Sequence, residues 1–124
     1  MDNQINVSEE TQREIEAFET IEKYKDYFQI VDEAFAVVAT GKGKERHNPR
    51  KLPFSEQQIV KVNLALGSTH GLLYQIIKKA DESSRLPHPM SRKELLDIIN
   101  YGIAAVIVLD KLVSLVETQG NKND

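Results

Sequence analysis

Cysteine and tryptophan are absent from the 124 residues, and the chain has only six glycines and four prolines. Without cysteine there is no disulfide framework, no thiolate metal site and no thiol nucleophile. Because glycine and proline are scarce, long stretches are free of the residues that break helices. No internal repeat or low-complexity segment occurs, and 40% of residues are hydrophobic and 28% charged. This composition favours a single soluble globular domain.

A long hydrophobic run is also missing. The longest, over 98–109, is shorter than the about 20 residues that a membrane-spanning helix needs, and Asn100 interrupts it. The first residues are polar and acidic and lack the apolar core of a signal peptide. We therefore expect a cytoplasmic protein without membrane association.

The net charge is small, at −3, but its distribution is uneven. Residues 1–41 carry ten acidic and three basic residues, whereas residues 42–93 carry eleven basic and four acidic ones. Clustered cations repel one another unless something neutralises them. The basic middle therefore has two explanations: it binds an anion, or the acidic N-terminal part neutralises it within the fold.

Apolar residues recur at steps of three and four along most of the chain, which predicts an all-α fold. We expect one domain over 1–124, folded as a bundle of four to five helices. Its predicted parts are an acidic helix or helix pair over 8–39, a basic loop over 40–54, two short helices over 55–82, a buried helix over 91–117 and a frayed tail over 118–124.

Three serines mark predicted helix starts. Ser8 precedes two glutamates, which the positive end of a helix dipole favours. Ser55 with Gln58, and Ser91 with Glu94, match the capping box, in which the serine and the third residue after it satisfy each other's backbone N–H groups. Gly67 is predicted to end the helix that Ser55 begins.

The last predicted helix is apolar nearly all round from Leu95 to Val116. A helix that is apolar on every side is covered by protein on every side. The chain has few other helices to cover it. We therefore expect a homo-oligomer, a dimer or larger, with this helix in the subunit interface.

The basic loop is the first candidate site. The glycines of its "GKGK" sequence allow the backbone to approach an anion closely, as in a phosphate-binding nest. The spacing is not that of a P-loop, since no Lys-Ser/Thr pair follows and no strand precedes it. Its candidate ligand-binding residues are Lys42, Lys44, Arg46 and His47.

A second group of cations flanks the turn before the last predicted helix. Lys78, Glu82 and Arg85 are spaced four and three apart, so they share one helical face. Arg92 follows across a short turn. We expect Lys78, Arg85 and Arg92 to converge on a phosphate-bearing ligand, with the basic loop from Gly41 to Lys51 closing over it. The alternative is a solvated ladder of ion pairs.

Polar residues also occur inside the apolar helix. Glu94 and Asp97 are three apart on one face, an arrangement that can hold Mg²⁺ through oxygen ligands, although Glu94 also has the capping role. Asn100 continues that face, and Tyr101 lies one turn after Asp97. Polar groups among apolar ones need hydrogen bonds, a ligand or a partner chain. Asp97, Asn100 and Tyr101 are therefore candidate ligand-binding residues.

The stretch "ADESSR…KELLDIINYGIAAVIVLDKL", within residues 78–112, resembles the C-terminal half of small all-α proteins related to MazG-like nucleoside triphosphate pyrophosphohydrolases, a group common in bacteriophage. The resemblance implies a four-helix core whose EExxE and ExxD motifs bind Mg²⁺ and a nucleotide. Glu94-Leu95-Leu96-Asp97 matches ExxD, but no EExxE occurs in the chain. Because pyrophosphohydrolysis needs several carboxylates to hold its metal ions, binding is favoured over catalysis.

These patterns predict a binding protein that captures a small phosphate-bearing nucleotide without hydrolysis and without a cofactor. If the source is a phage, a cyclic nucleotide that serves as a defence signal is a fitting ligand. Nucleic acid is not expected as a partner, because the net charge is negative and aromatic residues do not interleave with the basic ones. The alternatives are a Mg²⁺-dependent MazG-like pyrophosphohydrolase with Glu94 and Asp97 as metal ligands, and a phage-type protein that inhibits another protein by binding it.

Overall fold

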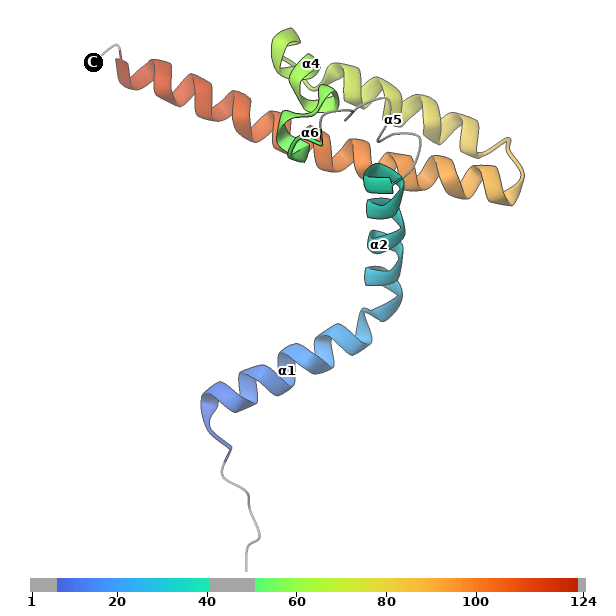
Figure 1. Cartoon of the computed structure of the whole chain (residues 1–124), viewed down its shortest axis with the longest axis vertical. Helices are drawn as coiled ribbons and strands as arrows, with labels where there is room; N and C mark the ends of the chain where they lie inside the picture. The colour runs from blue at the N-terminus through green and yellow to red at the C-terminus, as the bar shows by residue number, and fades with distance from the viewer. Residues whose placement is uncertain (1–6, 41–50, 123–124) are drawn as a thin grey trace, which may run out of the picture.

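The computed structural model describes residues 7–40 and 51–122. Within these ranges every regular element is helical and no strand occurs, which confirms the predicted all-α class. The elements are α1 (Glu9–Lys23), α2 (Lys25–Thr40), the short 3₁₀ helix η1 (Phe54–Glu56), α4 (Gln58–Leu66), α5 (His70–Ser83) and α6 (His88–Lys122). Figure 1 shows α5 lying along α6, α2 and α4 contacting the middle of α6, and α1 extending away from the other helices.

The acidic N-terminal segment forms a helix pair. Ser8 caps α1 as predicted, because its Oγ accepts a hydrogen bond of 3.2 Å from the backbone N–H of Thr11. The helix stops at Tyr24, whose backbone N–H donates to the carbonyls of Thr20 and Ile21 before α2 begins. No residue of α1 is buried, so this helix adds nothing to the core of the described chain.

The predicted capping box at Ser55 is wrong. Ser55 lies inside η1, and α4 follows an N-cap at Gln57 that makes no side-chain capping hydrogen bond. Tertiary contacts explain the difference. Phe54 packs against the core, and the backbone carbonyl of Ser55 accepts a hydrogen bond of 3.3 Å from Lys111 Nζ of α6. The segment is therefore shaped by its contact with α6 rather than by the start of α4.

The turn between α4 and α5 follows the sequence closely. Gly67 ends α4 as predicted, with φ of 69° in the left-handed region that glycine adopts without steric cost. Its N–H donates to carbonyls of the last turn of α4. A Cβ on Gly71 would lie 2.8 Å from Oδ1 of Asn63, so α5 approaches α4 this closely because residue 71 has no side chain.

The predicted capping box at Ser91 is also wrong. α6 already begins at His88, and the backbone N–H of Ser91 donates to the carbonyl of Pro87 at 2.9 Å, which places Ser91 within the first turn. Pro89 is tolerated there because N–H groups of a first helical turn have no acceptor within the helix. Glu94 is therefore free of the capping role.

α6 is 35 residues long and continues to Lys122 through the segment predicted as a frayed tail. One of its faces is buried, and its buried residues are Leu96, Asn100, Ala104 and Val108. The core cluster joins Ala104 and Val108 to Val60 of α4 and Leu72 of α5. The other face of α6 is exposed, so the described chain covers only one side of the helix that was predicted to be buried.

Among the described helices, α6 is long and apolar enough over His88–Gly120 to cross a membrane, with mean hydropathy reaching 1.8. Only 17% of that most apolar stretch is buried. A helix in a subunit interface has the same composition. Length and hydropathy therefore fit both a membrane-spanning helix and a helix that a second subunit covers.

Candidate functional site

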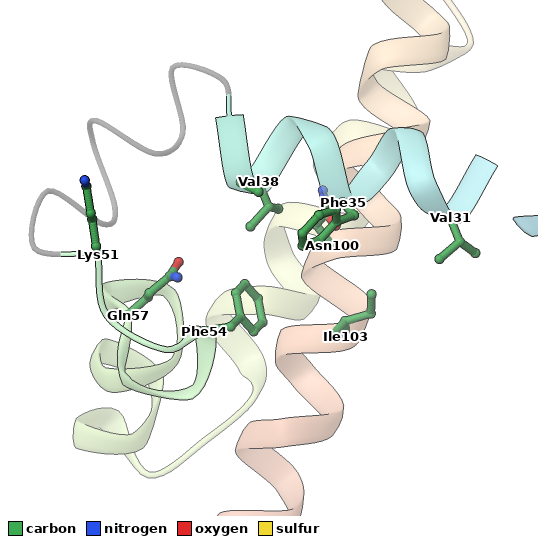
Figure 2. A pocket seen from close by; sticks show the side chains of 9 residues that line it. Val31, Phe35, Val38, Lys51, Phe54, Gln57, Asn100 and Ile103 are labelled. Atoms are coloured by element: carbon green, nitrogen blue, oxygen red, sulfur yellow. The ribbon is translucent and has the colours of Figure 1, made fainter. Parts of the chain in front are cut away.

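A cavity of about 610 Å³ lies between α2, η1 and α6. Its lining is mainly apolar and comprises Val31, Phe35, Val38, Ala39, Lys51, Phe54, Gln57, Asn100 and Ile103. Figure 2 shows Phe35 and Phe54 reaching it from α2 and η1, with Lys51 at one edge. The cavity thus combines two aromatic rings with an amine and two side-chain amides.

The α2 wall is fixed to α6 by polar contacts. Asn100 Nδ2 donates a hydrogen bond of 2.9 Å to the backbone carbonyl of Ala34, and both residues are buried. This bond explains why an asparagine is tolerated in an apolar helix, since a buried amide needs a partner. An ion pair between Arg92 and Glu33 links the same two helices. Asn100 was predicted from its sequence position as a ligand-binding residue, and here it both lines the cavity and joins two of its walls.

The opposite wall is fixed by the segment that follows the basic loop. Gln57 is buried, and its Nε2 donates to the backbone carbonyl of Leu52 at 3.1 Å, which closes the segment on itself. The hydrogen bond from Lys111 to Ser55 then ties η1 to α6. Just before this segment, Lys51 has φ of 54°, a left-handed conformation that is uncommon for residues other than glycine.

The predicted metal ligands lie elsewhere, around Lys79. The Lys79 ammonium donates to Oε2 of Glu94 and Oδ2 of Asp97, both at 3.1 Å, and all three side chains are largely buried. Burial is the largest influence on the pKa of Lys79 and lowers it, but the hydrogen bonds and charges of Glu94 and Asp97 together outweigh burial and raise the pKa above 10.5. The ring of Tyr101 lies 5.9 Å from Nζ, close enough for a cation–π contact. In the described residues, no group of three or more histidine, aspartate or glutamate side chains could hold a metal ion.

The three cations predicted to converge each have a separate carboxylate partner. Arg92 pairs with Glu33 of α2. Lys78 pairs with Glu82 on α5 at 3.9 Å, and Arg85, which lies in the turn after α5, pairs with Asp81 at 2.8 Å. Both of these pairs are exposed, as in the predicted alternative of solvated ion pairs, but Arg85 pairs with Asp81 and not with Glu82. In the described chain, no ion pair brings Lys78, Arg85 and Arg92 to a common partner.

The remaining predicted ligand-binding residues, Lys42, Lys44, Arg46 and His47, lie outside the described residues. The segment that carries them joins Thr40 to Lys51 in the sequence. Ala39 and Lys51, at its two ends, both line the cavity. The described residues that flank the basic segment therefore lie at this cavity.

Sequence reasoning missed the aromatic part of the site. Phe35 and Phe54 have the spacing of ordinary core residues, yet Phe35 is 64% exposed at the cavity. It also missed Lys79, because only the helical hairpin of α5 and α6 reveals that Lys79 faces Glu94 and Asp97. The one signal in the sequence was the unexplained acidic pair, which predicts a nearby cation of some kind.

Comparison with known proteins gave no match to any family model, curated protein or solved structure. The resemblance to MazG-like proteins therefore stays a prediction from the ExxD sequence.

Proposed function

We propose that the protein captures a small phosphate-bearing nucleotide without hydrolysing it, and that the ligand occupies the cavity between α2, η1 and α6. The observation that carries this proposal is that Ala39 and Lys51, which flank the basic segment in the sequence, line one cavity. Its volume of about 610 Å³ lies within the range of about 300–1,000 Å³ that is usual for small-molecule sites.

The lining suits the parts of a nucleotide. Phe35 and Phe54 offer ring faces on which a base can stack, and stacking of this kind tolerates any base. Gln57 and Asn100 bring side-chain amides; each uses one N–H in its hydrogen bond to Leu52 or Ala34, and an amide group has a second N–H and an acceptor oxygen that suit a base edge. Lys51 supplies positive charge for a phosphate group at the edge of the cavity.

Charge beyond Lys51 comes from the adjoining sequence. Lys42, Lys44, Arg46 and Arg50 all lie in the ten residues before Lys51 in the sequence, and in this proposal they add positive charge for the ligand. Arginine is suited to phosphate because its planar guanidinium group forms two parallel hydrogen bonds. In this proposal the anion-binding residues of the predicted basic loop serve the cavity rather than the turn at Arg85.

Capture without hydrolysis is supported by the position of Lys79. Its ammonium contacts both carboxylates of the ExxD sequence, Glu94 and Asp97, and so fills the position that a divalent cation would take between them. A metal ion bound there would have to displace a partly buried ammonium group whose pKa these carboxylates raise. The acidic pair therefore serves the α5–α6 contact in this proposal.

A thermal-shift panel tests the proposal with ATP, dATP, cyclic AMP and cyclic di-AMP. A nucleotide present at 100 times its Kd adds about 2.7 kcal/mol to the free energy of unfolding. We expect Lys51→Ala and Phe35→Ala to weaken this stabilisation, because both residues line the cavity and are exposed. Arg85→Ala is the matched control, an exposed cation away from the cavity, and should leave the shift unchanged.

Two results would contradict the proposal. One is that no nucleotide of the panel changes the melting temperature; the other is that Arg85→Ala abolishes the shift while Lys51→Ala keeps it, which would move the site to the turn. The enzyme alternative is tested in the same samples with Mg²⁺ by measuring released pyrophosphate. Release that Glu94→Gln eliminates would establish hydrolysis in place of capture.

A further inference from the structure

The exposed face of α6 carries an apolar stripe that the described chain leaves mostly uncovered, with Ile99 and Gly102 partly buried. The α6 stripe, as defined here, consists of Leu95, Ile99, Gly102, Val106, Leu109, Val113 and Val116. At 100° per residue it lies on the side of the helix opposite the buried residues. Val106, Val113 and Val116 are 59%, 49% and 69% exposed, although valine is among the residues most often buried in folded proteins.

The spacing of the α6 stripe is that of a coiled coil. Its members follow one another at steps of four and three over three heptads, with no interruption from Leu95 to Val116. A helix with this repeat is complementary to a copy of itself, because the apolar residues of each helix fill the gaps between those of the other. Gly102 has no atom within 4 Å of where a Cβ would stand, so it leaves room for a neighbouring helix.

The accessible surface of the chain exceeds what a monomer of its size should have. A monomeric protein of 14.1 kDa is expected to expose about 6,700 Å². The 10045 Å² of the whole chain also includes residues outside the described ranges, but among the described residues exposed large hydrophobic side chains outnumber the buried ones. Five of the seven stripe residues are among these exposed side chains, so the α6 stripe offers apolar surface to an interface, which typically buries about 800 Å² on each partner.

We propose that the α6 stripe packs against the α6 stripe of a second copy of this chain, as a two-stranded coiled coil. This inference is independent of any ligand in the cavity. A lipid bilayer is the competing partner, since α6 is long and apolar enough to cross one. Asp110, exposed beside Leu109 of the stripe, argues against the bilayer. A charged residue commonly flanks a coiled-coil seam, whereas in hydrocarbon it is costly.

The test compares two neighbouring positions of α6. Val113 belongs to the stripe and Ser114 does not, and both are exposed in the protomer, so Val113→Glu and Ser114→Glu should both fold and retain helical circular dichroism. By light scattering after gel filtration, the wild type and Ser114→Glu should have twice the mass of one chain. Val113→Glu should weaken association by about tenfold or more, because it buries a charge in the seam.

A monomeric wild type at 100 µM, or equal dissociation of both variants, would overturn the proposal. So would co-sedimentation of the wild type with phosphatidylcholine–phosphatidylglycerol vesicles that Val113→Glu abolishes, since this result assigns the stripe to a bilayer. The absence of cysteine permits a second measurement. Of the single variants Val106→Cys, Leu109→Cys and Val113→Cys, at least one should form a disulfide-linked dimer on oxidation, whereas Ser114→Cys should form none. A dimer of Ser114→Cys with none from the three stripe variants would also overturn the proposal.

Discussion

Lys79 determines what the two carboxylates of the ExxD sequence do. Glu94 and Asp97 would repel each other on one helical face if nothing lay between them, and the ammonium at 3.1 Å from both removes that repulsion. The same contacts hold the pKa of Lys79 above its ordinary value although burial acts to lower it. The ExxD sequence resembles a metal site, but in the structure Glu94 and Asp97 form an ion triad with Lys79 that joins α5 to α6.

Replacing this lysine should destabilise the protein. Lys79→Met leaves two largely buried carboxylates without their cation, and we expect a loss of about 1–3 kcal/mol in the free energy of unfolding at neutral pH, measured by urea denaturation. Lys78→Met is the control on the next residue, whose ion pair is exposed, and should change stability by less than about 0.5 kcal/mol.

The pH dependence gives a separate check on the same variant. Because folding raises the pKa of Lys79, its stabilising contribution is complete below 10.5 and is lost as the pH rises through the folded-state pKa. The stability difference between wild type and Lys79→Met should therefore be constant around neutral pH and shrink in strongly alkaline solution. An equal loss in Lys78→Met, or a difference that grows with pH, would contradict the triad.

At the scale of elements, the predicted helix ends that depend only on neighbouring residues were confirmed. Ser8 and Gly67 bound their helices as expected, since a cap needs only the adjoining turn. The predicted capping boxes at Ser55 and Ser91 were wrong. Lys111 of α6 donates a hydrogen bond to Ser55 in η1, and α6 begins one turn earlier than predicted, directly after Pro87. A local pattern has no information about such contacts.

The boundary of α6 can be tested by one substitution. Because Ser91 lies within the first turn and does not cap the helix, Ser91→Ala should change the free energy of unfolding by less than about 0.5 kcal/mol in thermal denaturation. A true N-cap would lose about 0.5–2 kcal/mol when its hydroxyl is removed. A loss of that size at Ser91 would show that the helix starts there after all.

The candidate site was predictable only in part for the same reason. Asn100 was found because a polar residue in an apolar run needs a partner, whatever the fold. Phe35 and Gln57 were not, since they are far apart in the sequence and only the contact of α2 and η1 with α6 brings them to one cavity. The positive charge of the middle segment was evident in composition, but its relation to the cavity depends on where Ala39 and Lys51 lie.

At the scale of the whole molecule, the described chain is open rather than closed around its core. α1 has no buried residue, and α6 is covered on one face only. Figure 1 shows α1 and the C-terminal part of α6 extending away from the region where α2, α4, α5 and α6 meet. The arrangement leaves the cavity at the meeting point of three elements, where a ligand would contact α2, η1 and α6 together and stabilise their packing.

Mapping the ligand on the protein is the most direct test of capture in this cavity. The measurement is a titration of ¹⁵N-labelled protein with the nucleotide that gives the largest thermal shift, followed through the backbone amide resonances. The proposal predicts that the largest changes occur at Phe35, Phe54 and Gln57, with Lys78 and Arg85 unaffected. Changes confined to Lys78 and Arg85, or no saturable change anywhere, would contradict it.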